Sequence, residues 1–267
     1  MLYNQLLHKA IKAAFYAGKE IMKVYGEDDF QVETKDDDSP LTKADKAADQ
    51  VIKSMLENTG IPVLSEEGKE IPYEARRNWK MFWLIDPLDG TKEFIKRNGE
   101  FTVNIALIEH QKPVAGVVFV PATQEVYYAS EYVGAMKMEG FQKELVLDQM
   151  LHDSRKLPLV KGRNVYTAVA SRSHMSPETE AFIDNKKAEH GEVETISRGS
   201  SLKLCMVAEG KADIYPRFAP TMEWDTAAGH AIAAISGATV TNHETGEPLE
   251  YNKENLLNPW FVVERKR

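Results

Sequence analysis

Three features of the sequence predict an α/β protein with an N-terminal α+β half and a C-terminal α/β half. Apolar residues recur at helical spacing over the first 25 residues. Residues 101–130 hold β-rich runs split by Pro-containing turns, which is typical of an antiparallel meander. From residue 165 onward, strand-like and helix-like segments alternate, which is typical of an α/β unit.

The N-terminal half is expected to begin with two helices, at roughly 2–25 and 42–58, joined by a polar segment with one or two short strands. A short strand over 61–68 follows, and then a strand in the apolar stretch at 81–90. Residues 140–163 are mixed and charged, so we expect them to connect the two halves.

The C-terminal half is expected to alternate between strands and helices. Its predicted strands cover 165–171, 192–197, 212–218 and 237–241, and its predicted helices cover 177–189, 200–209 and 224–236. We therefore expect one domain over 1–157 and a second over 158–267. Domain junctions are common places for ligand sites.

Composition narrows the class of protein. The chain has 267 residues, of which 43% are hydrophobic and 28% charged, as in a soluble globular protein of one or two domains. A net charge of -8 argues against binding of a nucleic-acid polymer. No apolar run approaches the roughly 20 residues of a membrane span, and the first residues do not form a secretory signal. The single cysteine, Cys205, favours the cytoplasm; peripheral association with the inner membrane face is left open.

The stretch WLIDPLDGTKEF, residues 83–94, leaves an apolar strand through two aspartates. Either Asp86 or Asp89 alone could be an ordinary turn residue that binds its own backbone. The pair is harder to explain in this way, because like charges raise each other's pKa unless a cation lies between them.

Other acidic residues also stand at the ends of predicted elements: Asp45, Glu66, Glu67 and Asp225. Each has an ordinary explanation. Asp45 could complete a capping box with Thr42, Asp225 could cap the following helix, and Glu66 and Glu67 could be a solvated loop pair. Their shared location at element ends, however, is where sites tend to be built.

If these carboxylates converge, an all-oxygen site without His or Cys favours Mg²⁺. A pair of Mg²⁺ ions could clamp both oxygens of a phosphate ester. Gly90 would let backbone N–H groups approach a phosphate, Thr91 could orient the attacking water, and Asp45 or Glu66 could take its proton. The chain has no P-loop or dinucleotide fingerprint, so monoester hydrolysis is favoured over transfer from ATP.

Asp45, the EE pair at 66–67, DPLDGT at 86–91 and WDTAA at 224–228 together resemble, in order, the lithium-sensitive, Mg²⁺-dependent phosphatases of the inositol monophosphatase family. The resemblance implies alternating layers of helices and sheets with the site between two domains. It implies two or three Mg²⁺ ions. It also implies that Glu67 supports the metal ligands without binding a metal itself. Asp45 would help to bind a further metal or position water with Thr91. The implied ligands are Glu66, Asp86, the carbonyl of Leu88, Asp89 and Asp225.

Within that family the chain is most similar to bacterial 3'(2'),5'-bisphosphate nucleotidases. The similar segments are KEF at 92–94, SRSH at 171–174, SSLK at 200–203 and YPR at 215–217, and Ser65 stands where inositol monophosphatases usually have Gly. By this resemblance the nucleotide side is lined by His174, Ser200, Lys203 and Arg217. The metal ligands Glu66, Asp89 and Asp225, with Leu88, Gly90 and Thr91, would also meet the substrate.

The leading hypothesis is hydrolysis of the 3'-phosphate of 3'-phosphoadenosine 5'-phosphate, a small bisphosphate nucleotide, in sulfur metabolism. The first alternative keeps the chemistry and changes the substrate, as in an inositol monophosphatase or a broad sugar phosphatase. The second is a non-catalytic Mg²⁺ or nucleotide sensor, which the complete set of acidic residues and Thr91 disfavours. The sequence leaves open whether the protein is a monomer or a homodimer.

Overall fold

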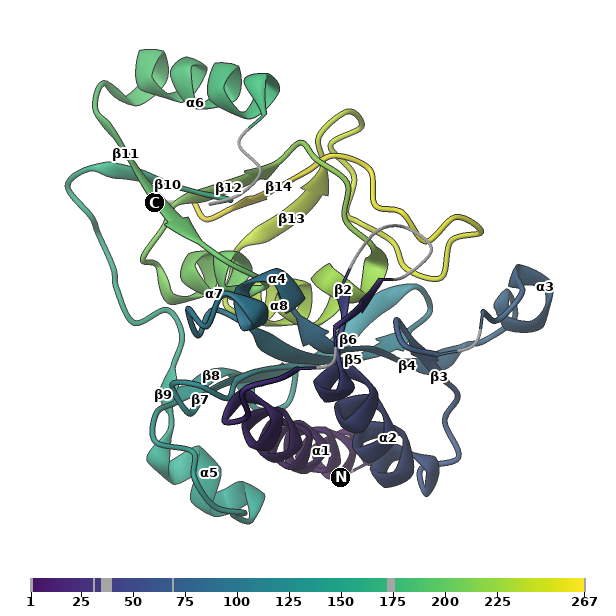
Figure 1. Ribbon diagram of the computed structural model, residues 1–267. Helices are drawn as coiled ribbons and strands as arrows, with labels where there is room; N and C mark the ends of the chain where they lie inside the picture. Colours follow the sequence, from purple (N-terminus) through teal and green to yellow (C-terminus); the bar gives the residue numbers. More distant parts are fainter. Residues whose placement is uncertain (1, 31, 35–39, 69, 172–175, 267) are drawn as a thin grey trace.

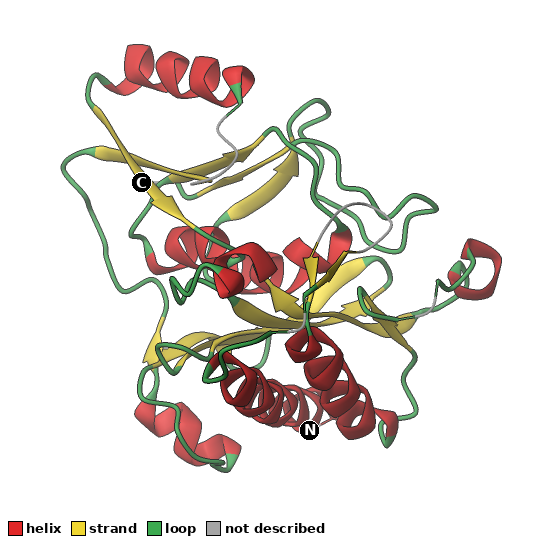
Figure 2. Ribbon diagram, viewed as in Figure 1, coloured by secondary structure: helices red, strands yellow, loops and turns green. Residues whose placement is uncertain are grey.

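A computed structural model of the chain describes residues 2–30, 32–34, 40–68, 70–171 and 176–266. Figure 1 shows two sheets stacked with helical layers, and Figure 2 shows the same view by element type. The helices in the described ranges are α1 (Leu2–Tyr25), α2 (Lys43–Glu57), α3 (Tyr73–Arg76), α4 (Thr91–Ile95), α5 (Leu147–Asp153), α6 (Pro177–His190), α7 (Leu202–Glu209) and α8 (Glu223–Ile235).

The first sheet has seven strands, which lie in chain order from β3 to β9. β3 and β4 are parallel, and every later pair is antiparallel, so the predicted meander is confirmed. The strands are β3 (Val63–Ser65), β4 (Met81–Asp89), β5 (Thr102–Glu109), β6 (Lys112–Val120), β7 (Glu125–Ser130), β8 (Gly134–Met138) and β9 (Arg155–Lys156). A separate two-stranded pair consists of β1 (Glu33–Thr34) and β2 (Pro40–Leu41).

The second sheet has five strands in the order β11-β10-β12-β14-β13. β10 is parallel to β11 and β12, but β14 is antiparallel to both of its neighbours. The expected alternation therefore gives a mixed sheet rather than a fully parallel one. The strands are β10 (Tyr166–Ser171), β11 (Val193–Arg198), β12 (Ile214–Arg217), β13 (Thr239–Asn242) and β14 (Phe261–Glu264).

The layers follow from which face each apolar residue buries. α1 and α2 cover one face of the seven-stranded sheet, α7 and α8 lie between the two sheets, and α6 covers the outer face of the five-stranded sheet (Figure 1). In β4, Trp83 and Ile85 pack toward α1 and α2, whereas Phe82 and Leu84 pack toward α7 and α8. Because both faces of this strand are covered, its sequence reads as one continuous apolar run.

A close approach sets the position of α8 on the first sheet. A Cβ atom at Gly116 in β6 would lie 2.4 Å from the carbonyl oxygen of Ala228, so only glycine lets the helix lie this near the strand. The N-terminus of α8, with Asp225, is thereby held over the end of β4.

Some elements were not predicted. Residues 140–163, expected to be a connection only, contain α5 and the short strand β9, which pairs with β8. α3, β8 and β14 also went unpredicted. The three strands among these are five residues or fewer, too short for a periodic pattern to stand out. The domain boundary at 157/158 stays a prediction.

Candidate active site

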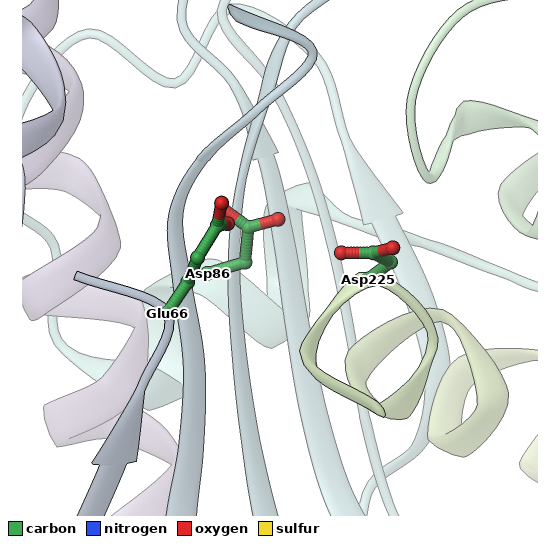
Figure 3. A group of neighbouring side chains, drawn as sticks. All are labelled: Glu66, Asp86 and Asp225. Carbon is green, nitrogen blue, oxygen red and sulfur yellow. The ribbon is translucent and has the colours of Figure 1, made fainter. Parts of the chain in front are cut away.

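Three carboxylates converge at one point: one from the turn after β3, one from β4 and one from α8. The side chains of Glu66, Asp86 and Asp225 each offer an oxygen, and these oxygens all lie within 4.8 Å of one another. Figure 3 shows Asp225, at the start of α8, facing the pair from the first sheet. The Glu66 N–H donates to the carbonyl of Ile85 over 3.2 Å, which continues the β3–β4 pairing and places Glu66 beside Asp86.

Burial and mutual repulsion make the charged forms of Asp86 and Asp225 less favourable. Burial raises the pKa of Asp86 well above its usual value, and the charges of Glu66 and Asp89 raise it further. Burial likewise raises the pKa of Asp225, with Asp89 and Glu66 adding to the effect. A hard divalent cation would remove this repulsion. Among the described residues the cluster contains carboxylates alone, so its donor set fits Mg²⁺ better than Zn²⁺.

The strand β4 runs through both aspartates, so the turn expected between them is not present. The Leu88 N–H donates to Asp86 Oδ1 over 3.0 Å, as in an ordinary Asp turn. The β4–β5 register is irregular between Asp86 and Asp89. The expected hydrogen bond from the backbone to Asp86 is therefore present, but it lies in an irregular stretch of strand rather than in a turn, and the same side chain also belongs to the carboxylate cluster.

Asp89 is held by residues from both halves of the chain. Its Oδ2 accepts the Ser201 N–H at 2.6 Å and lies 2.9 Å from the Ser201 hydroxyl. On the sheet side, Asn104 Nδ2 donates to the same oxygen over 3.3 Å and Thr102 Oγ1 donates over 3.4 Å. The sequence reasoning did not name Ser201, Asn104 or Thr102. Only the SSLK stretch at 200–203 pointed to this part of the chain.

Gly90 has a definite reason to be glycine. Its φ is +90°, and a Cβ atom there would lie 2.1 Å from Ser200 Oγ. That hydroxyl lies 2.9 Å from the carbonyl of Asp89 and 2.7 Å from that of Glu100. Ser200 therefore docks the start of α7 against the turn that follows β4.

Asp45 and Thr91 form a pair across two elements. Asp45 Oδ2 accepts the Thr42 N–H over 2.7 Å, and the predicted capping box of α2 is present. Asp45 Oδ1 accepts the hydroxyl of Thr91 over 3.2 Å. The helix cap thus fixes one oxygen and leaves the other directed at Thr91, whose hydroxyl also lies 3.3 Å from the carbonyl of Leu88.

Two cationic side chains flank this region. Lys203 is buried, and its Nζ donates to the carbonyls of Ser200 at 2.6 Å and Arg198 at 3.4 Å. Burial lowers the pKa of Lys203 to about 8, although the charge of Asp89 acts in the opposite direction. Arg217, at the end of β12, donates to the carbonyl of Pro220 over 3.0 Å. Its charge lowers the pKa values of both Lys203 and Asp225, so it lies near both.

Two further residues singled out in the sequence are His174 and Glu67. His174 lies outside the described residues. Glu67 donates its backbone N–H to Ser65 Oγ over 3.2 Å, and Ser65 in turn donates to Asp49 Oδ1 over 2.5 Å. Ser65, noted above for replacing glycine, therefore connects the loop that carries Glu66 to α2.

Comparison with known proteins decides the family. The model of the inositol monophosphatase family matches residues 3–263. The chain belongs to the inositol monophosphatase family. The layered fold that the motifs implied is that of its solved relatives. None of the helices in the described ranges combines the length and apolar character needed to cross a membrane.

Relatives within the inositol monophosphatase family differ in their similarity to this chain. The 3'(2'),5'-bisphosphate nucleotidase CysQ of Escherichia coli is 47% identical over 262 residues, which cover 97% of this chain and 99% of that protein. The crystal structure of CysQ from Bacteroides thetaiotaomicron is 54% identical, with a TM-score of 0.93 and full coverage of both chains. The extragenic suppressor protein SuhB from Bartonella henselae is 25% identical, with a TM-score of 0.72 and coverage of 97% and 92%.

Proposed function

We propose that this protein is a Mg²⁺-dependent 3'(2'),5'-bisphosphate nucleotidase that converts 3'-phosphoadenosine 5'-phosphate to AMP and phosphate. The observation that carries the chemistry is the convergence of Glu66, Asp86 and Asp225 within 4.8 Å. The substrate assignment is supported by the nearly full-length similarity to the CysQ proteins. The fold by itself does not select the substrate.

The proposed metal ligands are the carboxylates of Glu66, Asp86, Asp89 and Asp225, and the carbonyl of Leu88. Two or three Mg²⁺ ions would share these oxygens. When bound, they would supply charge stabilisation for the phosphate and make the attacking water more acidic. The raised pKa values of Asp86 and Asp225 support this proposal, because a cation would favour their charged forms.

Asp45 and Thr91 are proposed to orient the attacking water. Because Thr91 Oγ1 donates to Asp45 Oδ1, its lone pairs are directed toward other donors and can accept a hydrogen bond from water. As the water oxygen bonds to phosphorus, its proton would move to Asp45 through Thr91, or to Glu66. The bond between phosphorus and the ribose 3'-oxygen then breaks, and that oxygen leaves with AMP and takes a proton from solvent water.

The second phosphate would bind on the side of Lys203 and Arg217. A lysine ammonium group has three N–H donors, and two of those of Lys203 are directed at backbone carbonyls. The third can bind a phosphate oxygen, and Arg217 can add a charge-assisted hydrogen bond. Ser200 and the backbone N–H of Gly90 would complete the contacts near the cleaved group. Local positive charge of this kind reconciles an anionic substrate with an acidic protein.

A direct assay tests the proposal. Purified protein with 3'-phosphoadenosine 5'-phosphate should release phosphate and AMP in the presence of Mg²⁺, and a chelator should stop the reaction. Product analysis should show AMP rather than the 3'-monophosphate isomer. Absence of phosphate release with saturating Mg²⁺ would contradict the proposal and favour a non-catalytic sensor. We also propose that the enzyme acts in the cytoplasm, in sulfur metabolism.

A further inference from the structure

A buried polar network joins α3 to the start of α8, the helix that carries Asp225. Its three central side chains are Arg76, Asn252 and Glu223, which are 3%, 4% and 0% exposed. Arg76 ends α3, in the segment that follows Glu66. Glu223 is the first residue of α8, two positions before Asp225.

Arg76 binds the loop at 252–254 from the side of the first sheet. Its Nη1 donates to Asn252 Oδ1 over 2.9 Å and to the carbonyl of Lys253 over 2.6 Å, and its Nη2 donates to the carbonyl of Glu254 over 2.9 Å. Asn252 Nδ2 donates back to the carbonyl of Arg76 over 2.8 Å. The guanidinium is planar and has fixed donor directions, so these contacts define both the distance and the orientation of the loop.

The same loop binds the start of α8. Glu223 Oε2 accepts the Asn252 N–H over 2.6 Å, while Oε1 accepts the Lys253 N–H over 3.0 Å and Lys253 Nζ over 2.6 Å. The N–H of Glu223 donates to the carbonyl of Leu256 over 2.9 Å. An unbroken series of hydrogen bonds therefore runs from α3, through the loop, to the helix turn that carries Asp225.

A buried charged network is a poor way to gain stability alone, since well-packed apolar residues often serve as well. When every member has a partner, such a network instead fixes one geometry. Here the geometry that it fixes is that of the first turn of α8, which carries Asp225 two positions after Glu223. Partners of metal ligands of this kind commonly change metal affinity when they are removed.

We propose that Arg76 is a positioning residue for the metal site, acting through Asn252 and Glu223 to fix the first turn of α8 and, with it, Asp225 among the clustered carboxylates. The inference rests on the proposed function, because it assumes that these carboxylates bind Mg²⁺. Arg76 belongs neither to the proposed metal ligands nor to the proposed nucleotide contacts. Its removal should therefore weaken metal binding while leaving the chemical step intact once metal is saturating.

The test compares Arg76→Met with the wild-type protein by calorimetric Mg²⁺ titration. Methionine keeps much of the side-chain volume but removes all donors. We expect Mg²⁺ binding to weaken by roughly 10–100-fold, and the Mg²⁺ concentration for half-maximal phosphate release to rise in parallel. The kcat at saturating Mg²⁺ should stay near the wild-type value. Arg76→Lys should recover part of the affinity, because lysine can donate to one carbonyl but cannot reproduce the fork.

Two further variants separate positioning from stability. Val117→Ala removes two methyl groups from β6 on the face that packs toward α1, away from the carboxylates. It should lower the Tm and leave Mg²⁺ binding unchanged. Asn252→Gly suits the positive φ of 70° at this position and deletes only the side-chain contacts with Arg76. It should weaken Mg²⁺ binding even if Arg76→Met does not fold.

The outcomes are distinguishable. If Arg76→Met and Asn252→Gly lower the Tm as Val117→Ala does but bind Mg²⁺ like the wild type, the network is only structural and the inference is overturned. If the wild-type protein itself binds no Mg²⁺ in the titration, the proposed function fails and this inference fails with it.

Discussion

Ser201 donates its backbone N–H to Asp89 Oδ2 over 2.6 Å, and its hydroxyl lies 2.9 Å from the same oxygen. The hydroxyl also lies 2.7 Å from the carbonyl oxygen of Asp225. One serine at the start of α7 thus contacts one aspartate from β4 and another from α8. This contact joins the two halves of the chain at the carboxylate cluster.

Ser201→Ala should weaken Mg²⁺ binding by roughly tenfold or more, because it removes the hydroxyl that contacts both the Asp89 carboxylate and the backbone of Asp225. The remaining backbone N–H should keep the loop in place, so the Tm should change little. The measurement is the Mg²⁺ dependence of phosphate release together with a direct titration. Ser154→Ala is the matched control, since the Ser154 hydroxyl accepts a hydrogen bond from Tyr128 and takes no part in the carboxylate cluster. Equal metal affinities in both variants would argue against the orienting role.

Asp89→Asn should abolish activity with little loss of stability. The amide oxygen can still accept the Ser201 N–H, but the negative charge that would bind the cation is gone. Phosphate release and Tm should be measured on the same preparation. A large fall in Tm would instead support the view that Asp89 serves mainly to build the turn.

Thr91→Ala should lower kcat by roughly 10²–10⁴-fold with little change in KM, because the proposed path from water to Asp45 is broken. Thr91→Ser keeps the hydroxyl and should retain most of the activity. A rise in KM without a fall in kcat would place Thr91 in substrate binding rather than in water activation.

The pH dependence of kcat/KM should show the state of Lys203. Burial lowers its pKa to about 8, so the ammonium form that would bind a phosphate is present below this pH and is lost above it. For the bisphosphate nucleotide, kcat/KM should therefore fall as pH rises through about 8, since this ratio reports the free enzyme. Lys203→Arg keeps its charge at all such pH values and should remove that fall. An identical alkaline fall in Lys203→Arg would assign it to another group.

Long, strongly patterned elements were predictable from the sequence. The helices at the N-terminus and the meander of β5, β6 and β7 follow from apolar spacing over many residues. The missed strands instead depend on pairing with other strands. β9 has two residues and exists because β8 offers it an edge, and β14 inserts between β12 and β13 through long-range pairing. Local patterns carry little information about such pairing.

Part of the candidate site was likewise predictable from the sequence, and part was not. Asp86 and Glu66 could be expected together, because parallel strands end at the same edge of a sheet. The position of Asp225 depends on how closely α8 approaches β6 at Gly116, which no local pattern reveals. Ser201 was missed for the same reason, since its contacts to Asp89 exist only after α7 packs against the first sheet. Asn104 lies on β5 beside β4, so its contact to Asp89 depends on the register of that strand pair, which no local pattern reveals. The metal-ligand roles, the domain boundary and the oligomeric state stay predictions.

The ratio of kcat/KM values for 3'-phosphoadenosine 5'-phosphate and inositol 1-phosphate, measured with Mg²⁺ on the full chain, tests the proposed substrate most directly. A site with Lys203 and Arg217 arranged for a second phosphate should leave those cations unpaired with a monophosphate. We therefore expect the bisphosphate nucleotide to be preferred by roughly 100-fold or more. Equal or faster turnover of inositol 1-phosphate would contradict the assignment and make the protein an inositol monophosphatase instead.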